Sequence, residues 1–149
     1  MNRTIIKLFF YLCILTALPS YAQNAVHYYF KTMDIRNGLS QNTVYQILQD
    51  RKGFMWFGTK DGLNRYDGLS YRVYKKENSG LGKNFITALY EDHEGNIWIG
   101  TDGGVFIYNP VLDSFTAFNQ TSDKGTVIKD FVTMIGSDEY DNIWISVEN

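Results

Sequence analysis

The sequence is poor in cysteine, proline and basic charge. It has one cysteine and two prolines in 149 residues, which excludes a disulfide framework within the chain and a collagen-like or proline-rich disordered protein. Its formal net charge of −2 at pH 7 excludes the strongly basic surface that nucleic-acid binding needs. Hydrophobic residues make up 44% of the chain and aromatic residues 16%. This composition predicts a globular domain that depends on its hydrophobic core.

Long hydrophobic runs are also absent, apart from one near the N-terminus. Residues 8–18 are almost all apolar and follow Arg3 and Lys7. This run is shorter than the roughly 20 residues of a membrane-spanning helix. A basic segment, a short apolar run and small residues before the Ala22–Gln23 bond are typical of a signal peptide cleaved at that bond. An uncleaved membrane anchor is the alternative.

Residues 1–22 are therefore predicted to be a signal peptide, and the protein is expected in the periplasm. Cys13 lies inside the apolar run, so the mature chain has no cysteine and must be stabilised by its core. Removal of Arg3 and Lys7 from the 14 basic residues leaves 12 against 16 acidic ones, so the mature charge is −4.

An internal repeat is the main feature of the mature chain. Each copy has an aspartate six residues before a tryptophan, and the tryptophans are separated by 42 and then 46 residues. The three copies are DRKGFMWFGT at 50–59, DHEGNIWIGT at 92–101 and DEYDNIWIS at 138–146. A period of about 42 residues fits either four short strands or a pair of helices. The short apolar and aromatic runs, bounded by glycine, favour strands.

The turn chemistry supports antiparallel hairpins. Aspartate favours the first position of a type I turn, and glycine takes the left-handed conformation that reverses the chain. Gly53 and Gly95 occupy that position in the first two copies, and Asp141 replaces them in the third. Aspartate tolerates the left-handed region better than most residues, so the third turn is expected to form as well.

The fold class is therefore predicted to be all-β, with antiparallel four-stranded β-propeller blades, about two and a half in number, in an incomplete ring. The predicted segments are 23–38 as an N-terminal segment, 39–80 as blade 1, 81–127 as blade 2 and 128–149 as part of blade 3. Strands are predicted at 44–49, 54–58, 62–66 and 71–74, at 86–91, 97–100, 105–108 and 115–118, and at 132–135 and 143–147. Residues 26–31 are predicted to be a detached outer strand of the last blade in a complete ring.

The central strands are apolar on both faces, as a sheet between two neighbouring sheets must be. The tryptophans are therefore interpreted as core residues between blades rather than as ligand-stacking platforms. In the third copy, Ile143, Trp144 and Ile145 are expected to face water, and the open blade edges predict self-association of the isolated chain.

The motif Asp-x-x-Gly-x-Ile-Trp-Ile-Gly-Thr, followed by Gly-Val-x-x-Tyr at 104–108, resembles the two-component regulator propeller repeat. The segment MDIRNGLSQNTV at 33–44 also looks like the start of such sensors. The resemblance covers residues 28–148. It implies the N-terminal part of a periplasmic sensor of a hybrid two-component system in Bacteroidetes, which binds a glycan fragment. It also implies transmembrane, kinase and DNA-binding parts outside this sequence.

Catalytic and metal-binding patterns are weak. His27 and His93 have no partner at metal-ligand spacing, and His93 occupies a turn position where the other copies have Arg51 and Glu139. The acidic residues around His93 lack the ladder of a calcium-binding EF-type loop. We therefore expect no catalysis, no metal and no cofactor in this chain.

Ligand binding is the better functional reading, because propellers present loops at one end of their axis. The candidate ligand-binding residues lie in the loops after the second strands and in the crossings between blades: Asn42, Lys60, Asp61, Arg65, Asn84 and Asp102. The alternative for the asparagines and aspartates is a role in turn formation. An oligosaccharide is the expected partner, with no nucleic acid in this segment and membrane attachment only through segments outside it.

Two other functions stay open at this point. The chain could be a fragment of a secreted propeller enzyme, such as a lyase or a quinoprotein-like dehydrogenase, or a truncated product without function. An enzyme needs convergent catalytic groups or a cofactor motif, and neither is seen in the sequence.

Overall fold

The computed structural model describes Arg3 and residues 27–119 and 127–148, so the predicted signal peptide and its cleavage site lie outside the described residues. The chain divides into two units, Met1–Lys31 and Thr32–Asn149. In the first unit, residues 27–31 have no regular structure, and Tyr29 and Phe30 are almost fully exposed. The predicted ring-closing strand at 26–31 therefore stays a prediction. Within the described part of the chain, no helix has the length and hydrophobicity needed to cross a bilayer.

The second unit begins with a 3-10 turn, η1 (Ile35–Asn37), and continues into ten β-strands. The first sheet contains β1 (Val44–Gln49), β2 (Met55–Thr59), β3 (Gly62–Tyr66) and β4 (Tyr71–Tyr74). The second contains β5 (Ile86–Glu91), β6 (Ile97–Thr101), β7 (Gly104–Asn109) and β8 (Ser114–Ala117), and the third contains β9 (Phe131–Ser137) and β10 (Ile143–Glu148).

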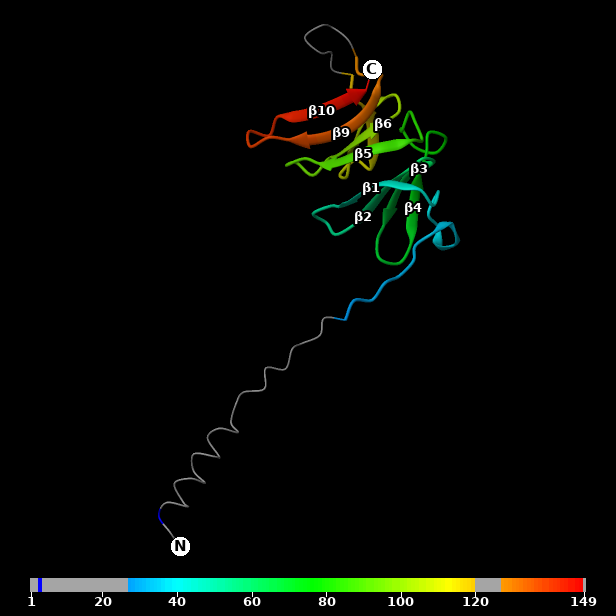
Figure 1. Cartoon of the computed structure of the whole chain (residues 1–149). Helices are drawn as coiled ribbons and strands as arrows, with labels where there is room; N and C mark the ends of the chain where they lie inside the picture. The colour runs from blue at the N-terminus through cyan, green and yellow to red at the C-terminus, as the bar shows by residue number, and fades with distance from the viewer. Residues whose placement is uncertain (1–2, 4–26, 120–126, 149) are drawn as a thin grey trace. The chain divides into compact units, whose positions relative to one another are not determined.

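Each sheet is an antiparallel meander in which sequential strands are hydrogen-bonded neighbours. The first strands β1, β5 and β9 lie beside one another, so the sheets stack face to face as blades around their inner strands (Figure 1). Two complete blades and one two-stranded sheet are present among the described residues, and they do not close a ring. The all-β propeller prediction is confirmed, and every strand predicted within the blades forms with its ends shifted by two residues or fewer.

The turn between the first two strands of each blade is built around the repeated aspartate. The Asp50 carboxylate accepts hydrogen bonds from the backbone N–H groups of Lys52 and Phe54, at 3.0 and 2.9 Å. Its second oxygen accepts the indole N–H of Trp56 at 2.8 Å. One carboxylate thus organises the turn and fixes the buried tryptophan, which explains the six-residue spacing.

The other two copies repeat this arrangement. Asp92 accepts the indole N–H of Trp98 at 2.8 Å, and Asp138 accepts that of Trp144 at 3.1 Å. Asp141 has a φ of 62°, in the left-handed region that Gly53 and Gly95 occupy in the equivalent turns. The expectation that aspartate could replace the turn glycine is confirmed.

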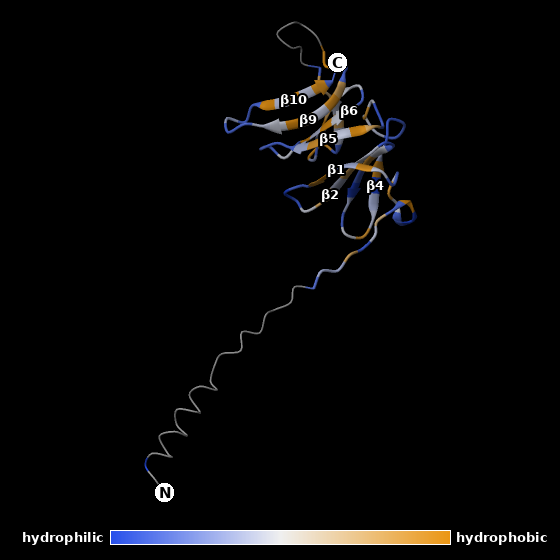
Figure 2. Cartoon of the chain, viewed as in Figure 1, coloured by the Kyte–Doolittle hydropathy of each residue, from blue (hydrophilic) through white to orange (hydrophobic). Residues whose placement is uncertain are grey.

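The first core lies between blades 1 and 2. Trp56 is 1% exposed, and its ring lies 5.1 Å from that of Tyr108 on the next blade. Ile97 and Ile99 of β6 belong to the same cluster, so they cover the face of blade 1 that carries Trp56. Figure 2 shows the hydrophobic segments on the strands and the hydrophilic ones in the connecting turns. Trp56 is therefore a core residue between blades, as predicted.

The second core lies between blade 2 and the third sheet, and it modifies one expectation. Ile143 and Ile145 pack against a cluster that includes Val132 and Val105, so they are only partly exposed. The prediction that they face water is wrong, because blade 2 covers their side of β10. Trp144 lies on the opposite side of the strand and is 66% exposed, as predicted.

The inner strands share a β-bulge at the same position of each copy. The register shifts between Val44 and Gln46 in β1 and between Ile86 and Ala88 in β5, which leaves Tyr45 and Thr87 unpaired. The pairing of β9 with β10 shifts in the same way, around Thr133. A bulge bends a strand and redirects its side chain, so the repeat positions one redirected residue per blade.

The hydrogen bonds to the repeated aspartates Asp92 and Asp138 predict a loss of stability in acid. Hydrogen bonds from Asn142 and Trp144 lower the pKa of Asp138 to about 2. Burial raises the pKa of Asp92, but hydrogen bonds from Trp98 and Asn96 outweigh it, and its pKa is lowered. Because these pKa values are lower in the folded state, their contribution is complete above the unfolded value of about 3.9 and is lost as the pH falls toward 2.

We expect urea unfolding to give a constant free energy of unfolding from pH 7 to about pH 5 and a decreasing one below about pH 4. The Asp138→Asn variant lacks one titrating carboxyl, so its decrease should be shallower. An unchanged decrease in this variant would contradict the assignment to Asp138.

Candidate functional site

Four of the six candidate ligand-binding residues meet at one end of the blades. The turn after β2 carries Lys60 and Asp61, and the adjacent N–H of Gly62 donates to the carbonyl of Asn84 at 2.7 Å. In the next blade, the N–H of Asp102 donates to the carbonyl of Phe85 at 3.3 Å. The turns after the second strands of both blades are therefore joined to the same crossing, the one between blades 1 and 2.

Asn42 and Asn84 have equivalent places in the two crossings and use their side chains in the same way. The amide oxygen of Asn42 accepts the N–H of Ile35 at 3.0 Å. The amide oxygen of Asn84 accepts the N–H of Lys76 at 2.7 Å, and its amide nitrogen donates to Glu77 at 3.3 Å. Both side chains hold a loop seven or eight residues upstream, which fits the turn-forming alternative for these asparagines.

The charged residues at this end are closer to solvent. Asp61 forms an ion pair of 2.6 Å with Lys75, at the end of β4. Lys60 and Asp102 are exposed. These groups can contact a ligand at the blade end without removal of a core contact.

Arg65 lies apart from the other candidates, in the interface between blades 1 and 2. Its guanidinium lies over the ring of Phe54 at 4.7 Å and near that of Trp56 at 5.7 Å. One of its nitrogens donates to the hydroxyl of Tyr108 on the next blade at 2.9 Å. The cation–π contacts and this hydrogen bond give Arg65 a role in joining the blades.

An aromatic row at the same end was not found from the sequence. The ring of Tyr45 lies 4.8 Å from that of Phe85, and Phe85 lies 5.7 Å from Phe131. We call Tyr45, Phe85 and Phe131 the aromatic row; it crosses the beginnings of the three inner strands. Tyr45 is the bulged residue of β1 and is 46% exposed. The signal for it was the recurrence of phenylalanine at 85 and 131, at the repeat spacing of 46.

The blade end therefore combines aromatic rings with exposed charges and with Asn84, and this combination suits recognition of a polar ligand that also has apolar faces. In residues 27–119 and 127–148, no group of three or more His, Cys, Asp or Glu side chains is placed to hold a metal ion. His93 lies in the turn between β5 and β6. Its side chain is exposed, 3.9 Å from Asp141 and 4.0 Å from Glu94.

The family model of the two component regulator propeller matches the chain twice, at residues 38–61 and 80–103. The two matches start 42 residues apart, which is the spacing of Trp56 and Trp98. The chain carries two-component regulator propeller repeats. Each matched segment includes an Asp-x-x-Gly turn and the strand after it. The hydrogen bond between Asp50 and Trp56 therefore lies within a two-component regulator propeller repeat.

Solved propeller structures are similar to the chain as well. The extracellular domain of BT3049 from B. thetaiotaomicron, assigned as a hybrid two component system, matches with a TM-score of 0.67 and 31% identity over 77% of this chain. The extracellular domain of BT4673 from the same organism, assigned as a one component system in one solved structure and as a hybrid two component system in another, matches with a TM-score of 0.61 and 31% identity over 70% of this chain. The chain covers 17% and 15% of these two domains.

A curated relative connects the repeat with signalling. Histidine kinase P4 from Formosa agariphila is 42% identical over 59 residues, which are 40% of this chain and 4% of the kinase. The chain is thus similar to parts of the extracellular domain of an assigned hybrid two component system and of a histidine kinase. The chain corresponds to a short part of each of these proteins.

Proposed function

We propose that the chain is the N-terminal part of a periplasmic β-propeller sensor domain of a hybrid two-component regulator, and that it recognises an oligosaccharide. The observation that carries the proposal is the pair of two-component regulator propeller repeats, together with 31% identity to the extracellular domains of two such systems. Kinase activity would belong to other parts of the sensor. Export depends on the signal peptide expected at residues 1–22.

The blade end described above is the proposed ligand-binding surface. Its aromatic row offers the apolar faces of sugar rings a stacking surface, and Lys60, Asp61 and Asp102 offer donors and acceptors for hydroxyl groups. The row crosses three blades, so it is long enough for more than one sugar unit. An oligosaccharide fits this surface better than a compact small molecule, which binds in a closed pocket.

Replacement of Tyr45 by alanine tests this proposal. Loss of an exposed stacking ring should weaken oligosaccharide binding about two- to tenfold, because an aromatic contact contributes about 0.5–1.5 kcal/mol. Isothermal titration of the 149-residue chain with a panel of oligosaccharides measures the effect. Tyr140→Ala is the matched control, because Tyr140 is also an exposed tyrosine. It lies in the turn between β9 and β10, at the other end of β9 from the aromatic row.

Equal affinities of the Tyr45→Ala variant and the unchanged protein would place the ligand elsewhere, and absence of binding to every oligosaccharide would overturn the glycan part of the proposal.

Self-association through the open blade edges is a separate proposal. It is supported by the exposed side chains of Met134 and Trp144 on the third sheet, both 66% exposed.

A further inference from the structure

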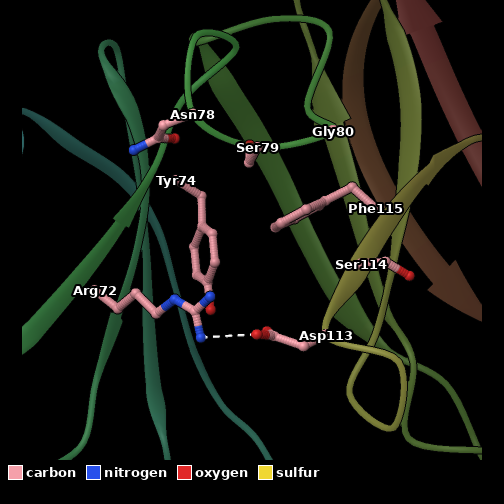
Figure 3. A pocket seen from close by; sticks show the side chains of 8 residues that line it. All are labelled: Arg72, Tyr74, Asn78, Ser79, Gly80, Asp113, Ser114 and Phe115. Carbon is pink, nitrogen blue, oxygen red and sulfur yellow. Dashed lines mark ion pairs between the residues drawn. The ribbon is translucent and has the colours of Figure 1, made fainter.

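A pocket lies between the outer strands of blades 1 and 2, away from the aromatic row. Figure 3 shows its lining residues, which come from β4 and the loop after it on one side and from β8 with its preceding turn on the other. The cavity has a volume of about 220 Å³. We call it the outer pocket; the side chains used below are Arg72, Tyr74, Asp113, Ser114 and Phe115.

The acidic side of the outer pocket is held by a chain of hydrogen bonds that starts in the core. Arg65 donates to the hydroxyl of Tyr108, and this hydroxyl donates to the Asp113 carboxylate at 2.7 Å. The second oxygen of Asp113 pairs with Arg72 at 2.9 Å. The hydrogen bond from Tyr108 and the pairing with Arg72 lower the pKa of Asp113, so its carboxylate is ionised at neutral pH.

The backbone also fixes Asp113 in place. Its φ of 49° lies in the left-handed region, which non-glycine residues seldom adopt. The preceding turn is capped by Asn109, whose side chain accepts the N–H groups of Val111 and Leu112 at 2.9 and 3.0 Å. The carboxylate is therefore positioned by its turn, by Tyr108 and by Arg72 before any ligand arrives.

One buried polar group at the pocket lacks a partner. Tyr74 is 4% exposed, and its hydroxyl has no hydrogen-bond partner among the described residues. Figure 3 shows that the hydroxyl end of its ring points toward the Arg72–Asp113 pair. Buried hydroxyl groups are nearly always hydrogen-bonded in proteins. The neighbouring hydroxyl of Tyr108 already bonds Arg65 and Asp113, so the hydroxyl of Tyr74 can take a further partner.

The size and chemistry of the pocket define the ligand. Drug-sized ligands occupy roughly 300–1,000 Å³, so a hollow of about 220 Å³ suits a single six-membered ring. The paired Arg72 and Asp113 are charge-balanced, and their side chains are 54% and 44% exposed. Together they offer N–H donors beside a carboxylate acceptor, which matches two neighbouring hydroxyl groups.

The apolar wall fits the same ligand. The rings of Tyr74 and Phe115 meet edge to face at 5.0 Å and line the side of the hollow (Figure 3). Aromatic rings provide the apolar surface against which the C–H face of a sugar packs. An anion would gain from Arg72 but would be repelled by Asp113, so a neutral ring is favoured.

We propose that the outer pocket binds one neutral sugar ring, whose neighbouring hydroxyl groups contact the Arg72–Asp113 pair and the hydroxyl of Tyr74. The inference rests on the proposed function for the class of ligand. It adds a second site, which would hold a single sugar unit on the outer side of the blades.

Saturation-transfer NMR on the 149-residue chain tests the proposal with the methyl glycosides of glucose, galactose and mannose, and with glucuronate as the charged probe. We expect millimolar binding of at least one neutral glycoside, and binding about tenfold weaker in Tyr74→Phe, which removes only the hydroxyl. Tyr90→Phe is the matched control, because the Tyr90 hydroxyl bonds Ser137 at a different interface. Arg72→Met should weaken binding to a similar degree.

The outcomes separate this inference from the proposed function. Weaker glycoside binding in Tyr74→Phe but not in Tyr45→Ala supports the outer pocket, even if no oligosaccharide binds the aromatic row. Unchanged binding in Tyr74→Phe overturns the pocket and leaves the oligosaccharide proposal intact. Absence of binding to all three glycosides, or a clear preference for glucuronate, also overturns it.

Discussion

Replacement of Trp56 by alanine should lower the free energy of unfolding by about 3–5 kcal/mol, the usual cost of removing a large aromatic side chain from a core. Trp56 is 1% exposed and lies in the core between blades 1 and 2, against Tyr74 and Tyr108. The rest of the interface cannot collapse into the space, because it is built from the strands of two separate sheets. Equilibrium urea unfolding measures this change. It is monitored by circular dichroism, because this signal does not depend on the tryptophan that is replaced.

The repeat supplies the matched controls. Trp144 has the equivalent place in the third sheet but is 66% exposed, so Trp144→Ala should cost less than about 1 kcal/mol. Trp98 is partly buried against Phe118, 5.0 Å away, and Trp98→Ala should fall between the two. If the Trp56→Ala chain does not fold, Trp56→Phe should still show a smaller loss. Equal losses at positions 56 and 144 would contradict the order of burial.

Much of the fold could be predicted because each repeat carries its own local instructions. Asp50, Gly53 and Trp56 specify a turn and the strand after it within seven residues, and the same instructions recur around Trp98 and Trp144. Repetition then excludes other readings, since an accidental pattern does not return at 42 and 46 residues. Even the substitution of Asp141 for glycine followed from local backbone preference.

The site was less predictable, because its residues interact across blades and several lie outside the repeated pattern. Arg65 corresponds to Ile107 in the next blade, so the repeat gave no reason to place it against Tyr108, 43 residues away. The position of Phe85 and Phe131 is occupied by Thr43 in the first blade. There the bulged Tyr45 meets Phe85 instead, and a bulge cannot be read from periodicity. The contact of Asp113 with Arg72 likewise depends on how two outer strands approach each other.

These differences assign separate roles to repeated and unrepeated residues. The aspartates, turn glycines and tryptophans build each blade and its contact with the next one. The residues that vary between copies, such as Tyr45, Lys60, Arg72 and Asp113, lie at blade ends or outer strands, where ligands can reach them. Specific recognition in a repeat protein is therefore expected at the positions that the repeat leaves free.

Removal of the Asp50 carboxylate should have the second large effect. In Asp50→Ala the buried indole N–H of Trp56 and the backbone N–H groups of Lys52 and Phe54 lose their acceptor. A buried donor without a partner costs about 1–3 kcal/mol, and the two backbone groups can still reach water, so we expect a total loss of about 2–4 kcal/mol. Asp50→Asn keeps a side-chain oxygen as acceptor and should recover part of this loss.

A double-mutant cycle with Trp56→Phe isolates the bond between the carboxylate and the indole, because phenylalanine keeps most of the ring and lacks the N–H. If the hydrogen bond between Asp50 and Trp56 stabilises the fold directly, Asp50→Ala should lower the free energy of unfolding by about 1–2 kcal/mol less in the Trp56→Phe background than in the unchanged protein. Asp138→Ala provides the exposed counterpart, since its bond to Trp144 lies at the surface and water can replace it. A coupling near zero at Asp50 and Trp56 would mean that the aspartate acts through its turn alone, and the six-residue spacing would then need another explanation.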